Sequence, residues 1–190
     1  MNSSIWFLSA LIFAPAVGGM ILLLLPSEKT ETIKRVSFAI TLLVFLATVL
    51  MAIPGFQTSA DFQIGDPNMQ HVSKVAWIPS FNIEYYLGVD GISFPLVVLT
   101  SFISMLAMLA SWPIQKHVKA YCVLFLLLET GMLGVFLVLD FFLFFVLWEV
   151  MLLPMFFLIG VWGGPRREYA AIKFFLFTLV GGVLMLIAIL

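Results

Sequence analysis

The feature that most constrains the fold is a series of apolar runs, each long enough to cross a lipid bilayer. They cover residues 4–25, 36–53, 89–111, 120–139, 141–162 and 170–190, and charged or proline-containing breaks separate them. A helix needs about 20 apolar residues to span the hydrocarbon core, and lipid offers no hydrogen-bond partners to the backbone of an open strand. The sequence therefore predicts an all-α integral membrane protein, with six transmembrane helices in one membrane domain, 1–190.

The composition agrees with this fold class. Hydrophobic residues make up 63% of the chain, charged residues make up 10%, and the mean hydropathy is +1.18. Soluble domains average about 25% charged residues, so a water-soluble core is excluded. The net charge of −1 provides no basic field for nucleic acid.

The break between the fourth and fifth predicted helices depends on a turn at Asp140. Without it, the apolar run 123–162 would form one helix of forty residues. Such a helix would be about 60 Å long, twice the thickness of the hydrocarbon core of about 30 Å. A tight turn near Asp140 is therefore required.

Basic residues predict the orientation, because cytoplasmic loops carry an excess of lysine and arginine. Six spans place eight basic residues in or next to the first, third and fifth loops, and only Lys74 lies in the long second loop, 54–88. The eight are Lys29, Lys34, Arg35, Lys116, Lys119, Arg166, Arg167 and Lys173. We expect the N-terminus outside and the odd loops in the cytoplasm or its topological equivalent.

The second loop, 54–88, carries a pattern of its own near its end. Apolar or aromatic residues alternate with polar or small ones from residue 81 to residue 88, a period of two that is typical of a β-strand. We predict a strand or hairpin over the outer ends of the helices. A disordered loop is the alternative.

Small residues inside the predicted helices indicate where helices pack. Gly131, Gly134, Gly181 and Gly182 are of the kind that lets helix backbones approach closely. The single cysteine, Cys122, has no partner for a disulfide and no histidine at metal-ligand spacing. We interpret these five residues as packing residues without chemistry.

Three ionisable residues fall inside the predicted helices: Glu129, Glu149 and Lys173. A charge at the centre of a membrane helix costs about 2.5–3.5 kcal/mol. Glu129 and Glu149 each lie nine residues from a predicted helix end, about 14 Å deep, whereas Lys173 lies nearer the cytoplasmic face and Asp140 at the outer end. Titratable groups at several depths suit a proton path. We predict all four as proton-channel residues, with Glu149 first and Lys173 second.

Each of the four has a structural alternative. A protonated Glu129 or Glu149 could bond to a neighbouring helix, Lys173 could extend to the lipid headgroups, and Asp140 could be the polar residue of a turn. Glu149 is favoured because Pro154 follows five residues later. Proline frees a carbonyl one turn back, and a helix kink beside the carboxyl would open it to water.

Several segments together resemble a known family. Trp148, Glu149 and Pro154 are spaced as W-E-x-x-x-x-P, and the segments WGG (162–164) and AAIKFF (170–175) follow. The segment YYLGVDGIS covers residues 85–93. With these motifs the chain resembles, over nearly its whole length, the antiporter-like membrane subunits of respiratory complex I.

This resemblance implies a subunit of fourteen transmembrane helices, so we expect the chain to be an N-terminal part of a longer protein. In the family the glutamate matching Glu149 is a key proton-channel residue, paired with a lysine on a seventh helix that would follow Leu190. Lys173 matches the lysine of the family's AAIKFF motif, and Asp140 matches an acidic position. Family subunits bind no NADH, flavin or iron–sulfur cluster, and we expect these cofactors in other subunits.

We therefore expect a proton-translocating subunit of NADH-quinone oxidoreductase in the bacterial inner membrane, with other membrane subunits, the lipid bilayer and protons as its partners. Two alternatives stay open. The first is a subunit of a multisubunit sodium/proton antiporter or of a membrane-bound hydrogenase, which share the fold. The second is a structural membrane scaffold, which predicts that neutralising Glu149 leaves transport intact.

Overall fold

The computed structural model describes residues 3–51, 53 and 68–189. The elements in chain order are α1 (Ser3–Leu24), α2 (Thr30–Leu50), β1 (Gln70–Ile78), a short 3-10 turn η1 (Pro79–Phe81), β2 (Ile83–Val89), α3 (Ser93–Ala110), α4 (Val118–Leu137), α5 (Phe141–Trp162) and α6 (Arg167–Ile189). Each of these six helices is long and apolar enough to cross a membrane. The predicted all-α membrane fold with six spans is confirmed.

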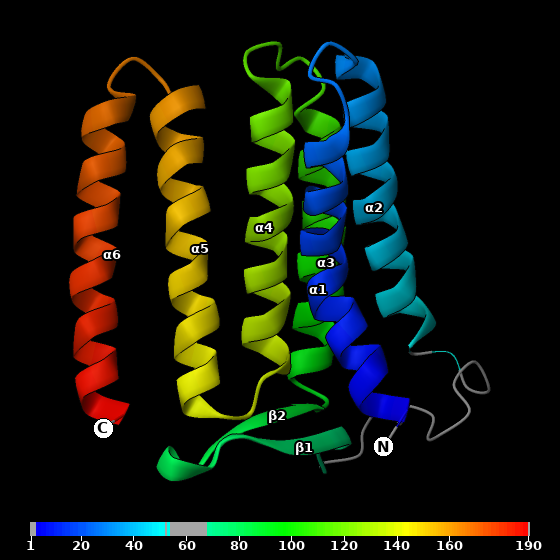
Figure 1. Cartoon of the computed structure of the whole chain (residues 1–190), viewed down its shortest axis with the longest axis vertical. Coiled ribbons are helices and arrows are strands. Elements are labelled where there is room, and N and C mark those ends of the chain that lie inside the picture. Colours follow the sequence, from blue (N-terminus) through cyan, green and yellow to red (C-terminus); the bar gives the residue numbers. More distant parts are fainter. Residues whose placement is uncertain (1–2, 52, 54–67, 190) are drawn as a thin grey trace.

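The six helices run side by side, and the hairpin of β1 and β2 lies across one end of the bundle (Figure 1). The connections α1–α2, α3–α4 and α5–α6 gather at the opposite end. We call these two ends the hairpin end and the basic end, because the eight basic residues of the odd connections lie at the second. The predicted segregation of charge is therefore a property of the fold.

Helix α4 lies at the centre of the bundle and packs against α1, α2, α3 and α5. In contrast, α6 packs chiefly against α5 and lies at the edge (Figure 1). Buried apolar side chains form two clusters, one of which includes Leu8 and Leu137 and the other Leu22 and Cys122. The Cys122 thiol is buried and free, in agreement with its interpretation as a packing residue.

Two of the four predicted packing glycines lie where α4 meets α5. A Cβ on Gly131 would overlap the side chain of Met151, and one on Gly134 would come within 2.6 Å of a methyl group of Leu147. Close packing at these two positions is confirmed. A Cβ on Gly181 would meet no described atom within 4 Å, so close packing at this position stays a prediction.

The predicted hairpin is confirmed, with β1 and β2 antiparallel. Asn82 adopts a left-handed conformation (φ 53°, ψ 33°) at the end of the connecting turn, which asparagine tolerates better than most residues. Lys74 donates to Glu84 at 2.7 Å across the strands, and the Tyr85 hydroxyl lies 2.8 Å from the Ser9 hydroxyl of α1. The hairpin is thus fixed to the helix ends. The first part of the predicted outer loop, 54–67, lies outside the described residues.

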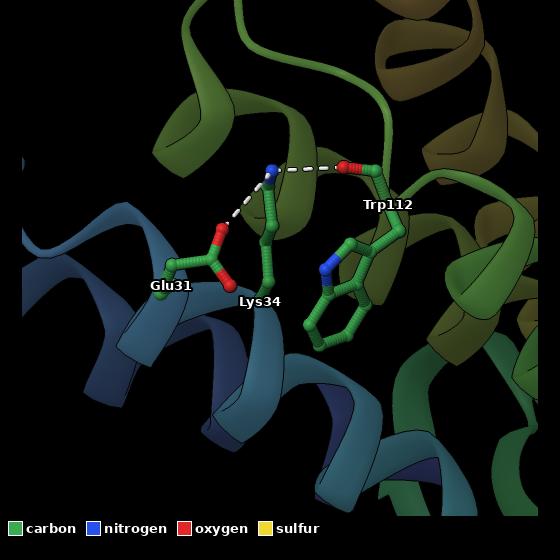
Figure 2. Close-up of polar contacts among 3 residues, drawn as sticks. All are labelled: Glu31, Lys34 and Trp112. Carbon is green, nitrogen blue, oxygen red and sulfur yellow. Dashed lines mark hydrogen bonds and ion pairs between the residues drawn. The ribbon is translucent and has the colours of Figure 1, made fainter.

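Helix α2 begins at Thr30, six residues before its predicted start, so the placement of Lys34 in a loop is wrong. Lys34 is only 5% exposed. Its ammonium donates to the Trp112 carbonyl at 2.8 Å and lies 3.7 Å from the Glu31 carboxylate (Figure 2). These partners allow a charged side chain to lie inside the bundle, where an unpaired charge would be costly.

Cations at the basic end also satisfy helix ends. Three cations donate to carbonyl oxygens at or just beyond the last turn of a helix. Lys34 donates at the end of α3 at 2.8 Å, and Lys119 donates twice at the end of α1, at 2.7 and 2.8 Å. Arg167 donates at the end of α5 at 3.2 Å. The last carbonyls of a helix have no partner within it, and this end of the helix dipole is negative. Three of the residues that predict topology therefore also stabilise the C-terminal ends of the three odd helices.

Candidate intramembrane proton site

Asp140 fixes the start of the helix that carries the site. One carboxylate oxygen accepts from the amides of Phe142 and Leu143 at 2.9 and 3.0 Å, so Asp140 is the N-cap of α5. The other oxygen accepts from the Glu84 amide of β2 at 3.2 Å. An N-cap satisfies amides that have no partner within the helix. Asp140 thereby fixes the start of α5 to strand β2 of the hairpin.

Glu149 lies nine residues further along α5, about 14 Å from its start. Its Oε1 atom is shielded from solvent and has no hydrogen-bond partner among the described residues. A Cβ on Gly182 of α6 would overlap this oxygen, so the carboxyl lies directly against the backbone of α6. The missing side chain at Gly182 provides the space that the carboxyl occupies.

The orientation of Glu149 follows from its neighbours on α5. Leu147 and Met151 face α4, where they meet the glycines of that helix. Glu149 is two residues from each of them, and two residues correspond to about 200° around a helix. The carboxyl therefore points away from α4, into the contact between α5 and α6.

Glu129 of α4 is fully buried, and neither of its carboxyl oxygens has a hydrogen-bond partner among the described residues. Gly131 marks the face of α4 that meets α5, and Glu129 is about 200° around the helix from it. Glu129 instead shares a face with Cys122, two turns earlier, which packs in a cluster with Ile33 of α2 and Met108 of α3. Its carboxyl therefore points toward α2 and α3.

The four predicted residues do not form one cluster. Glu129 and Glu149 lie within about one helical turn of the same depth, but on opposite sides of the pair formed by α4 and α5. Lys173 lies nine residues before Gly182 on α6, about 14 Å closer to the basic end, and is exposed. Asp140 lies at the hairpin end. Along α5 and α6 the charged groups thus stand at three depths, with Glu149 in the middle.

Pro154 is buried inside α5, which is helical from Phe141 to Trp162. The kink beside Glu149 stays a prediction. Within the described ranges, no group of three histidine, cysteine, aspartate or glutamate residues is arranged to hold a metal ion. The chemistry that this arrangement supports is the binding and release of a proton by a carboxyl in mid-membrane.

Two features of the structure go beyond the sequence predictions. Gly182, predicted as a packing residue, also leaves the space that the Glu149 carboxyl occupies. Lys34, predicted in a loop, is a buried cation of α2. A signal for the latter exists, because Glu31 is an acidic residue in the first turn of α2, and acidic residues are frequent at helix starts.

Ionisable side chains at mid-depth in a bundle of membrane-spanning helices indicate a candidate functional site. Comparison with known families makes the class specific. The model of "NADH-ubiquinone oxidoreductase chain 4, amino terminus" matches residues 11–140, and that of "NADH:quinone oxidoreductase/Mrp antiporter, TM" matches residues 138–190. The chain belongs to the NADH-ubiquinone oxidoreductase chain 4 family, and the resemblance to antiporter-like subunits is confirmed.

Individual relatives agree with this assignment. The chain is 43% identical to NADH-ubiquinone oxidoreductase chain 4 of Prototheca wickerhamii, over 97% of this chain and 37% of that protein. It is 39% identical to the chloroplastic NAD(P)H-quinone oxidoreductase chain 4 of Mesostigma viride, over 99% of this chain and 36% of that protein. The chain therefore spans about a third of the length of these relatives.

A solved structure shows the same fold. The chain is similar to a chain of respiratory complex I from Thermus thermophilus, with a TM-score of 0.78 and 25% identity. The match covers 95% of this chain and 34% of that chain.

Proposed function

We propose that this chain is the N-terminal part of a proton-translocating membrane subunit of NADH-quinone oxidoreductase, of the subunit M type, and that Glu149 is its central proton-binding group. The observation that carries the proposal is the environment of the Glu149 carboxyl. It lies at mid-depth in a helix contact, with one oxygen shielded and without a partner among the described residues. An isolated charge is expensive there, so the carboxyl responds strongly to any change in nearby charge or water.

The mechanism is electrostatic, and the only bonds made or broken in this chain are those to protons. Redox chemistry elsewhere in the complex shifts a charge near the α5–α6 contact. The shift changes the affinity of Glu149 for its proton, because a neighbouring charge favours or disfavours the ionised carboxyl. Flavin and iron–sulfur clusters belong to other subunits, and the neighbouring membrane subunits complete the path.

The other predicted residues enter the proposal through their depth. Lys173 lies between Glu149 and the basic end, and Glu129 provides a second buried carboxyl on the opposite side of α4 and α5. We propose that Asp140 acts on the path by holding α5 in place. We place the protein in the bacterial inner membrane. We further propose that the basic end faces the cytoplasm and the N-terminus lies outside, because basic residues accumulate in cytoplasmic loops.

The test is Glu149→Gln in the protein within its host complex, with Glu28→Gln as a matched control, since Glu28 is an exposed glutamate outside the helices. After assembly is verified, NADH-driven proton pumping and NADH-quinone electron transfer are measured in membrane vesicles. We expect Glu149→Gln to abolish pumping and slow electron transfer, with the control unchanged. Wild-type pumping in Glu149→Gln would leave this carboxyl a packing residue. If the wild type has no NADH activity and Glu149→Gln instead loses sodium-dependent proton exchange, the protein would be assigned to the antiporters.

A further inference from the structure

A cleft of about 810 Å³ lies along α6 at the basic end, beside the connection from α5. Three basic residues line it, namely Arg166, Arg167 and Lys173. Further along α6 the wall becomes aromatic, with Phe174 and Phe177. The cleft is therefore cationic near the end of the bundle and apolar toward the middle of the membrane.

The three cations have no anionic partner in the described part of the chain. Arg167 donates one N–H group to a backbone carbonyl, which leaves its other donors available. The Lys173 ammonium lies 5.7 Å from the ring centroid of Tyr169. The guanidinium of Arg166 forms no hydrogen bond or ion pair with any described residue. One carboxylate, that of Glu168, lines the adjoining hollow with both arginines, so positive charge is in excess.

The distribution of charge along the cleft matches an amphiphile. From Arg167 to Phe177 the wall extends about 15 Å along α6, and Phe177 is 84% exposed. We propose that this cleft binds an anionic phospholipid, with its phosphate held by Arg166, Arg167 and Lys173 and an acyl chain against the two phenylalanines. Basic pockets at the ends of membrane helices bind such headgroups, and arginine matches phosphate oxygens in geometry.

Two other occupants fit less well. A free phosphate ion would use the cationic part of the cleft and leave the aromatic wall unoccupied. A further apolar helix packed on α6 would cover the aromatic wall, but it would also bury three cations without an anion to neutralise them, which is costly. Only an anionic lipid satisfies both parts of the wall.

The experiment compares wild type with the double variant Arg166→Gln/Lys173→Gln, each purified as the intact complex. Delipidated protein is incubated with mixed micelles that contain phosphatidylglycerol, and the retained lipid is quantified by mass spectrometry. The matched control is Arg35→Gln, since Arg35 is an exposed cation of the same end outside the cleft. A charge-conserving variant, Arg166→Lys/Lys173→Arg, separates loss of charge from damage to the fold.

We expect the double variant to bind phosphatidylglycerol roughly 30-fold more weakly, because each basic residue near an anionic headgroup contributes about 1 kcal/mol. The control and the charge-conserving variant should retain the lipid. Equal retention of phosphatidylglycerol by the double variant and wild type would overturn the proposal. Absence of lipid retention in wild type would also overturn it, and is the result expected if another part of the protein covers the cleft. Displacement of the lipid by inorganic phosphate at comparable concentration would assign the site to a free anion instead.

Discussion

Asp140 offers the sharpest test of how α5 is positioned. Asp140→Ala removes the acceptor for two amides at the start of α5 and for the Glu84 amide of the hairpin. Loss of an N-cap costs about 1 kcal/mol, and loss of a hydrogen bond to a charged group costs about 1.5 kcal/mol or more. We expect a total of about 2–3 kcal/mol, which corresponds to about 5–10 °C in the midpoint of thermal unfolding.

The matched variant is Asp140→Asn, because asparagine caps helices about as well as aspartate but does not titrate. Thermal unfolding in detergent and NADH-driven proton pumping per assembled complex are measured for both variants. If Asp140 acts by capping, Asp140→Asn keeps the two bonds to the start of α5 and near wild-type pumping, and loses only the bond from the Glu84 amide, because its NH2 group cannot accept. Asp140→Ala loses more stability and part of its pumping. Abolished pumping in Asp140→Asn, in a complex more stable than Asp140→Ala, would refute this mechanism and make Asp140 a titrating channel residue.

Three further predictions concern other parts of the bundle. Gly182→Ala should displace the Glu149 carboxyl and alter the pH profile of pumping. The matched control Gly181→Ala should leave the profile unchanged, because a Cβ there meets no described atom within 4 Å; identical profiles for the two variants would contradict the contact. Lys34→Met should lower the free energy of unfolding by about 1.5–3 kcal/mol, because it leaves the partly buried Trp112 carbonyl without its charged donor, and chemical denaturation should detect the loss. The Asp90 carboxylate accepts from the amide of Ser93, the first residue of α3, and this bond holds the pKa of Asp90 below its ordinary value. The resulting stabilisation is fully present above pH about 4 and is lost as the pH falls through the lowered pKa; Asp90→Asn should remove this pH dependence from thermal unfolding.

Much of the architecture was readable from the sequence because the membrane imposes strict rules. The length of an apolar run decides whether it can span, and the turn at Asp140 followed from length alone. The alternation near residue 85 indicated the hairpin. The depth of Glu149 followed from counting residues at 1.5 Å each.

Helix boundaries were less predictable where a charged residue lay near a helix end. Hydropathy ends a helix at the first cation, whereas the backbone continues as long as its hydrogen bonds are satisfied. Lys34 shows the difference, since it lies inside α2 with its charge balanced by Glu31 and by a carbonyl beyond α3. No local pattern reveals a partner that is 78 residues away in the sequence.

The sequence by itself determined the number of spans, the gathering of the basic loops at one end, the hairpin and the distances of Glu129 and Glu149 from their helix ends, because these depend on distance along the chain. Only the tertiary structure decided the direction in which each carboxyl points. Glu149 faces Gly182 of α6, and Glu129 faces away from α5. The direction depends on which helix packs on which face, and that choice is made by contacts between residues far apart in the chain.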